Sequence, residues 1–65
     1  MKIILNGQQQ ETDCRNLLEL IEATVKSPQG VICEYNGEIT PQERWAQITL
    51  NGEDKIELLS LVGGG

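Results

Sequence analysis

The residues best suited to chemistry in this sequence are three consecutive glycines, Gly63, Gly64 and Gly65. Because glycine lacks Cβ, an extended run of glycines is about as thin as a polypeptide can be, and it can enter a channel that a folded body cannot. Such a tail would present the Gly65 carboxylate to a partner's active site, where adenylation by ATP would supply the leaving group that a free carboxylate lacks. Glycine runs are also common in inert or disordered tails, and on their own the glycines favour that interpretation.

No other group of residues in the sequence forms an independent catalytic site. The sequence has no histidine, which excludes a catalytic triad and a histidine general base. The spacing of Cys14 and Cys33 fits neither a zinc site nor a Cys-x-x-Cys redox pair, and we expect both to be buried small hydrophobic residues. Glu53, Asp54 and Glu57 could hold a cation, but a solvated acidic loop is the commoner arrangement. We therefore expect no enzyme, no metal site and no bound cofactor.

Size and charge narrow the function further. A chain of 65 residues forms one domain, which we place at residues 1–62, with residues 63–65 as a flexible tail. Ten acidic residues against five basic ones give a formal charge of −5, which argues against nucleic-acid binding and suits docking on basic surfaces, although simple solubility explains it as well. No apolar run approaches the roughly 20 residues of a membrane-spanning helix, and no signal peptide is apparent, so we expect a cytoplasmic protein.

Three Asn-Gly pairs, at residues 6–7, 36–37 and 51–52, mark predicted turns, because both residue types tolerate positive φ. They help to divide the sequence into five predicted strands, at residues 1–5, 8–12, 31–35, 47–50 and 55–62. The first two strands form a predicted hairpin. Its apolar first strand could be central in a sheet, and its polar second strand suits an exposed edge.

A helix is predicted between the second and third strands. Apolar residues recur there at the spacing of one helical face: Cys14, Leu17, Leu18, Ile21 and Val25. Asp13 is the expected N-cap, with Thr12 as the alternative. The helix should end near residues 26–27, because Pro28 disfavours helical geometry in the residue before it.

A second, short helical turn is predicted at residues 40–43. Thr40 can cap it, Pro41 suits its first position, and Glu43 can reach back to the Thr40 amide, an arrangement known as a capping box. Trp45 follows one turn later and is expected to lay its indole ring on the core. The elements together predict an α+β fold, with one helix packed on one sheet. The predicted core consists of Ile3, Leu5, Leu17, Leu18, Ile21, Val25, Cys33, Ile56 and Leu58.

The last predicted strand changes its pattern close to the glycines. Ile56 and Leu58 face one side, whereas Leu59 and Leu61 would point to the other. A shift of one residue exchanges the buried and exposed faces of a strand, so some of these leucines are expected to face solvent. Exposed apolar patches often mark partner sites, which makes Leu59, Leu61 and Val62 candidates for docking. A bulge that buries both sets of side chains is the competing explanation.

Six short segments together carry a resemblance to a known family. They are Ile3-Ile4-Leu5-Asn6-Gly7, Leu17-Leu18, Tyr35-Asn36-Gly37-Glu38-Ile39, Pro41 with Arg44-Trp45, Asp54-Lys55-Ile56-Glu57 and Leu61-Val62-Gly63-Gly64-Gly65. In order, spacing and total length, they make the whole chain resemble the ThiS family of sulfur carriers in thiamine biosynthesis, although no single segment is specific. The sequence departs from the family at Gly52-Glu53-Asp54, where Asp-Gly-Asp is frequent; this affects the expected turn geometry and not the function.

The resemblance implies both a fold and a reaction cycle. The fold is the ubiquitin-like β-grasp, a five-stranded mixed sheet curled around one helix. In the cycle, a ThiF-type enzyme would adenylate the Gly65 carboxylate, and sulfur from a cysteine desulfurase or another sulfur donor would replace AMP to give a thiocarboxylate. A ThiG-type thiazole synthase would then accept the sulfur, so the chain would be a protein co-substrate and not an enzyme.

Two alternatives remain open from the sequence. The small subunit of molybdopterin synthase is similar and also ends in Gly-Gly, although its members are usually longer and the segment from Pro41 to Trp45 argues against it. The other alternative is a non-catalytic ubiquitin-like binding module whose glycine tail is inert.

Overall fold

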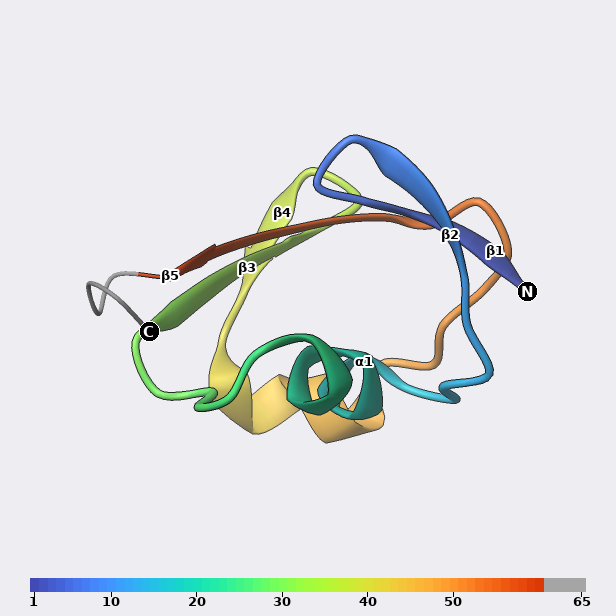
Figure 1. Cartoon of the computed structure of the whole chain (residues 1–65). Coiled ribbons are helices and arrows are strands. Elements are labelled where there is room, and N and C mark those ends of the chain that lie inside the picture. The colour runs from blue at the N-terminus through green and yellow to red at the C-terminus, as the bar shows by residue number, and fades with distance from the viewer. Residues whose placement is uncertain (61–65) are drawn as a thin grey trace.

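The computed structural model describes residues 1–60, whose strands and helices form two layers (Figure 1). In chain order the elements are β1 (Lys2–Leu5), β2 (Gln8–Glu11), α1 (Leu17–Thr24), β3 (Val31–Tyr35), β4 (Glu38–Thr40), the 3₁₀ helix η1 (Gln42–Gln47) and β5 (Lys55–Ser60). The strands of this part of the chain make one five-stranded sheet in the order β2-β1-β5-β3-β4. β1 and β5 are parallel and the other neighbours antiparallel, so the predicted mixed sheet with one main helix is confirmed. α1 and η1 both lie on one side of the sheet.

Two of the three Asn-Gly pairs form the predicted hairpin turns. Residues 6–7 join β1 to β2 and residues 36–37 join β3 to β4, with φ angles between 50° and 90° that asparagine and glycine tolerate. The third pair behaves differently, because Glu53, with φ 71°, takes the left-handed conformation there. That turn leads into β5 without forming a hairpin, because the predicted strand at residues 47–50 is not part of the sheet.

The fourth strand of the sheet is not the predicted one. The strand that pairs with β3 at the sheet edge is β4, which has only three residues. Residues 48–50 are extended, but they bond to the segment that leads into α1. The Leu17 N–H donates to the Ile48 carbonyl at 2.9 Å, and the Leu50 N–H donates to the Arg15 carbonyl at 3.0 Å. The apolar pattern at 48–50 thus reflects a pairing outside the sheet.

This pairing also sets where α1 begins. Asn16, and not Asp13 or Thr12, is the N-cap, since its Oδ1 accepts a hydrogen bond from the Glu19 N–H at 2.8 Å. The Glu19 carboxylate in turn accepts from the Arg15 N–H at 2.7 Å. Because residues 15–17 are bonded to the extended segment, the helix cannot begin earlier, and Cys14 lies before it. The helix ends at Thr24, two residues short of the predicted region.

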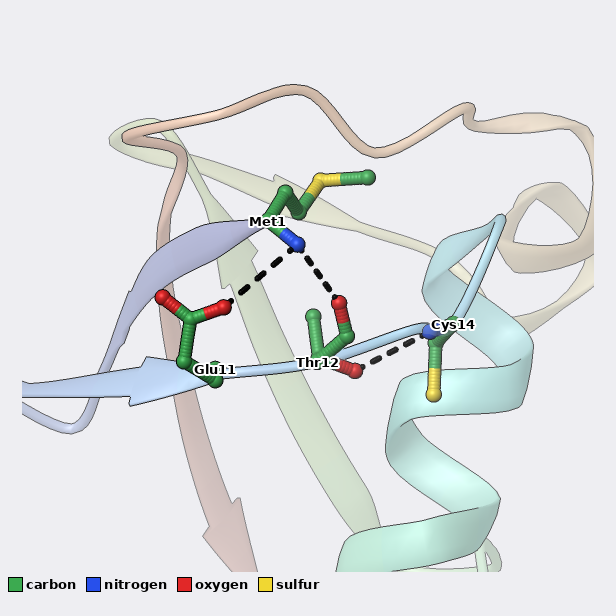
Figure 2. Close-up of polar contacts among 4 residues, drawn as sticks. All are labelled: Met1, Glu11, Thr12 and Cys14. Carbon is green, nitrogen blue, oxygen red and sulfur yellow. Dashed lines mark hydrogen bonds and ion pairs between the residues drawn. The ribbon is translucent and has the colours of Figure 1, made fainter.

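The open end of the β1–β2 pair is closed by the first residue of the chain (Figure 2). The ammonium group of Met1 donates to the Thr12 carbonyl at 2.9 Å and lies 3.7 Å from the Glu11 carboxylate. The Thr12 hydroxyl accepts from the Cys14 N–H at 3.1 Å, which turns the chain toward α1. Thr12 therefore belongs to the strand-to-helix connection and not to the helix cap.

The second helical element begins without the predicted capping box. Thr40 lies in β4, where its hydroxyl donates to the Cys33 carbonyl at 3.3 Å, and Pro41 occupies the N-cap with no side-chain cap bond. Trp45 is 1% exposed and its indole N–H donates to the Thr40 carbonyl at 3.0 Å. The expected packing of the indole on the core is confirmed, and the bond to Thr40 satisfies its polar edge. No helix within residues 1–60 has the length and apolar character to cross a bilayer.

The core lies between the sheet and the two helices. Its buried residues are Ile3, Leu5, Leu17, Leu20, Ile21, Cys33, Trp45, Leu50 and Ile56. Six of the nine predicted core residues are therefore fully buried, while Leu18, Val25 and Leu58 are half-buried and pack against them. Leu20 was not predicted, because the buried face of α1 is centred on Leu17, Leu20 and Ile21 and not on the predicted stripe.

Candidate functional site

β5 is the element that leads toward the glycine tail, and it lies in the middle of the sheet (Figure 1). Its first half is paired on both sides, since Ile56 lies beside Leu5 of β1 and opposite Tyr35 of β3. The pairing with β3 continues in regular register as far as Ser60 opposite Val31. This unbroken register excludes the bulge that was the competing explanation for the pattern of leucines up to residue 60.

Two asparagine side chains hold β5 in place. The Asn36 Oδ1 accepts from the Lys55 N–H at 2.8 Å, at the start of the strand. The Asn6 Oδ1 accepts from the Leu58 N–H at 2.8 Å, where β1 has already turned away into its hairpin. Both asparagines stand first in an Asn-Gly turn, so one residue supplies the turn conformation and an acceptor for β5. The Asn-Gly pairs predict the turns, but nothing in the sequence near them indicates this second role.

A buried carboxylate fixes the turn that precedes β5. Asp54 is 8% exposed, and its Oδ2 accepts from the Tyr35 hydroxyl at 2.6 Å and from the Asn51 N–H at 2.8 Å. Its Oδ1 accepts from the Asn36 side-chain amide at 3.1 Å. Asp54 is thus not part of a solvated acidic loop as predicted, although Glu53 and Glu57 are exposed. Residues 1–60 contain no cluster of three or more acidic, cysteine or histidine side chains that could hold a metal ion.

The pKa values of Asp54 and Tyr35 follow from their burial and their hydrogen bonds. Burial by itself would raise the pKa of Asp54, but the bonds from Tyr35, Asn51 and Asn36 outweigh it and hold the pKa below the ordinary value of 3.8. Burial, together with the bond to the Asp54 carboxylate, raises the pKa of Tyr35 to about 12. The carboxylate is therefore charged and the phenol neutral at physiological pH, which is the arrangement that the short bond requires.

Neither cysteine has the surroundings of a nucleophile. Cys33 is a residue of β3 whose side chain is buried in the core, and burial raises the pKa of its thiol above the ordinary value of 9.0. Cys14 is half-buried beside the core, and both thiols are free. Their predicted role as small hydrophobic residues is confirmed for Cys33 and holds in part for Cys14.

The face of the sheet that is turned away from the helices carries exposed apolar side chains. Leu59 is 59% exposed and Ile39 is 70% exposed. A hollow on this face is lined by Asn6, Ile32, Glu34, Glu57, Leu58 and Leu59. The expectation that a leucine of the last strand faces solvent is confirmed for Leu59. The other predicted site residues lie outside the described residues: Leu61, Val62, Gly63, Gly64 and Gly65. So does the predicted boundary between body and tail.

Comparison with known proteins identifies the family. The family model of ThiS matches residues 3–65, which is nearly the whole chain. The chain belongs to the ThiS family. It is 30% identical over 66 residues to the sulfur carrier protein ThiS of Escherichia coli, with the full length of both proteins covered. ThiS proteins are small carriers and not themselves catalysts, in agreement with the expectation from the sequence.

Solved structures agree with this assignment. The crystal structure of the thiamine biosynthesis protein ThiS from Geobacter metallireducens matches with a TM-score of 0.83 and 32% identity, covering all of both chains. The fold is therefore the β-grasp of the ThiS proteins. A thiazole synthase of Paramagnetospirillum magneticum is 34% identical over 67 residues, but this chain spans only 20% of that protein.

Proposed function

We propose that this ThiS-family chain is a sulfur carrier for thiazole formation in thiamine biosynthesis, and that the Gly65 carboxylate carries the sulfur as a thiocarboxylate. The observation that supports this proposal most is the ThiS match, because it extends through residue 65 and so includes all three glycines. The β-grasp body, which pairs the first half of β5 on both sides and its second half with β3, is consistent with such a role.

The proposed cycle has three chemical steps at the end of the tail. In the first, a carboxylate oxygen attacks the α-phosphorus of ATP on a ThiF-type enzyme, and pyrophosphate leaves to give the acyl-adenylate. In the second, the terminal sulfur of a persulfide attacks the acyl carbon and AMP leaves. A thiol then cleaves the resulting acyl disulfide and releases the thiocarboxylate. The persulfide would come from a cysteine desulfurase or another sulfur donor.

The chain's own residues would contribute position and not catalysis. Asn6 and Asn36 hold β5, and the Asp54 network fixes the turn before it, so the tail would leave a rigid body at a defined place. Exposed Leu59 would dock on the ThiF-type enzyme, together with Leu61 and Val62. The glycines, which have no side chains, would then enter the adenylating site.

A ThiG-type thiazole synthase is the proposed acceptor of the sulfur. The match between this chain and a segment of a protein named thiazole synthase supports a physical link between the two activities. The cytoplasm is the proposed compartment, and the two free thiols fit a reducing environment.

Intact-mass measurement tests the proposal. The purified chain is incubated with a ThiF-type enzyme, ATP, a cysteine desulfurase and cysteine. We expect a mass increase equal to the exchange of one oxygen for one sulfur, and no such increase for a variant that lacks Gly64 and Gly65. If the intact chain gains no mass under conditions in which the enzyme modifies its own known carrier, the proposed chemistry is wrong. An inert tail would also leave partner binding unchanged in the truncated variant.

A further inference from the structure

The outer face of the sheet places two like charges directly opposite each other. Glu34 of β3 pairs with Glu57 of β5, and both side chains are exposed on the face turned away from the helices. Directly opposite residues of an antiparallel pair have Cβ atoms about 4.5–5.5 Å apart, and like charges at that distance destabilise the pair. The free protein therefore maintains an arrangement that its own folding disfavours.

No cation of residues 1–60 forms an ion pair with either glutamate. Among residues 1–60, the only ion pair joins the Met1 ammonium group to Glu11. Glu11 lies in β2, the edge strand on the far side of β1 from β5. Lys55 is two positions from Glu57 along β5, but it lies within 4 Å of neither carboxylate. The two glutamates do not form a metal site either, since no third metal-binding side chain joins them in this part of the structure.

Apolar side chains lie beside the two carboxylates along β3 and β5 and on the neighbouring β4. Ile32 pairs with Leu59 in the next outward-facing position of the same two strands, and Ile39 of β4 pairs with Glu34. Both glutamates and both members of the Ile32–Leu59 pair line the hollow on this face. A protein surface that covers Leu59 must therefore also cover Glu34 and Glu57. Covering two carboxylates without a cation would carry a large desolvation cost.

We propose that these four residues, Ile32, Glu34, Glu57 and Leu59, form a receptor for an arginine side chain of the ThiF-type enzyme. The guanidinium group would lie between the two carboxylates, while apolar side chains around it would cover Ile32 and Leu59. Arginine suits this position better than lysine, because its planar donors can serve two carboxylates at once. The inference rests on the proposed function, and it adds the chemistry by which the enzyme would recognise its carrier.

In this receptor the two glutamates strengthen binding to the ThiF-type enzyme, whereas their mutual repulsion lowers the stability of the free fold. Replacing both, in a Glu34→Gln/Glu57→Gln variant, keeps the side-chain shape and removes the charges. We expect the Kd for the ThiF-type enzyme to rise at least about tenfold, as for the loss of a charged hydrogen-bonded contact. We also expect the Kd to depend less on salt concentration, and the thermal midpoint to stay the same or rise.

The matched controls are Glu22→Gln and its combination with Glu43→Gln, because these exposed glutamates lie in the helical layer. The double control has the same net charge as the receptor variant. Calorimetric titration of the ThiF-type enzyme at low and physiological salt compares all four proteins, including the wild type. If the receptor variant and the double control have the same Kd and salt dependence, the inference is wrong. A lower thermal midpoint for the receptor variant would also overturn it, since the carboxylates would then stabilise the fold.

Intact-mass measurement separates this inference from the proposed function. At saturating ThiF-type enzyme, the receptor variant should still be converted to the thiocarboxylate, because its tail is unchanged. Normal conversion with normal Kd would overturn the receptor and leave the sulfur-carrier function intact. If the wild type itself is neither bound nor converted, the proposed function falls, and the receptor falls with it.

Discussion

The side-chain oxygen of Asn6 accepts a hydrogen bond from the Leu58 N–H at 2.8 Å and so joins the first turn to the last strand. The backbone of Asn6 makes the preceding bond to this strand in the opposite direction, because its N–H donates to the Ile56 carbonyl at 2.9 Å. Because the chain turns at Asn6, its side chain takes over as acceptor for β5. This contact supports the strand just before the proposed reactive tail.

Replacing Asn6 by glycine should separate the contact from the turn. Glycine adopts the same φ of 50°, so the hairpin should persist while the Leu58 N–H loses its acceptor. We expect a loss of about 0.5–1.5 kcal/mol in the free energy of unfolding and faster amide hydrogen exchange at Leu58. Amide exchange followed by NMR measures both, with the Ile3 amide as an internal reference. Unchanged protection of Leu58 would show that the side-chain bond is unimportant.

The Tyr35–Asp54 bond should appear in the pH dependence of stability. The pKa of Asp54 is lowered on folding, so its contribution is present above pH about 3.8 and is lost as the pH falls through the folded-state value. The pKa of Tyr35 is raised from 10.0 to about 12, so its contribution is present below pH 10 and is lost as the pH rises from there through about 12.

A Tyr35→Phe variant tests this pH dependence. It removes a hydrogen bond to a charged group, and we expect a loss of about 1.5–3 kcal/mol at neutral pH. We also expect a smaller difference from the wild type above pH 10, and a weaker loss of stability in acid. Urea unfolding across the pH range gives these differences, and ultraviolet titration of the single tyrosine gives its pKa directly. A Tyr35 pKa near 10 would contradict the burial and bonding described above.

The local signals in the sequence gave the most accurate structural predictions. The two Asn-Gly hairpins, the polar edge strand β2 and the alternation that exposes Leu59 depend on neighbouring residues only. The failures concern contacts between distant segments. Nothing near residues 48–50 indicates that they bond to residues 15–17, and that one pairing displaced both the predicted fourth strand and the start of the helix.

In the candidate site, too, features set by neighbouring residues were predicted and contacts between distant segments were not. The exposure of Leu59 followed from strand periodicity, whereas the burial of Asp54 could not, because two of its three partners, Tyr35 and Asn36, come from a distant strand and its turn. An isolated acidic residue in a polar loop has the same local pattern whether it is solvated or buried. The strand β4 was missed because three residues are too few to establish a period of two.

The corrected helix face changes the expected effect of core substitutions. Leu20 is 1% exposed, so Leu20→Ala should lower the free energy of unfolding by about 2–5 kcal/mol. Leu18 is only half-buried, and Leu18→Ala should cost less than about 2 kcal/mol, because part of its side chain already contacts water. Urea denaturation of the two variants measures the difference. Equal costs would indicate that the helix is rotated from the position described.

Leu59 allows a test of the proposed docking surface. Leu59→Glu should raise the Kd for the ThiF-type enzyme by at least about tenfold and leave the thermal midpoint nearly unchanged, since the side chain is 59% exposed. Leu61→Glu is predicted to behave in the same way. Ala46→Glu, at an exposed position of η1 in the helical layer, is the control for added charge. If both leucine variants unfold, those residues belong to the core and the enzyme docks elsewhere.

The proposed chemistry depends on the position of the Gly65 carboxylate relative to the folded body. An activating site must hold that carboxylate within a near-attack distance of about 3–3.5 Å from the α-phosphorus of ATP. One added residue moves the end of the chain by up to roughly 3.5 Å, and its side chain would obstruct a channel shaped for glycine. A protein extended by one alanine after Gly65 should therefore fold normally, bind the ThiF-type enzyme through its leucines, and lose adenylation by a factor of at least about 100. Pyrophosphate–ATP exchange measures adenylation, and circular dichroism confirms the fold. Normal exchange by the extended and unprocessed protein would rule out the carrier mechanism, because the carboxylate would then react equally well from a different position.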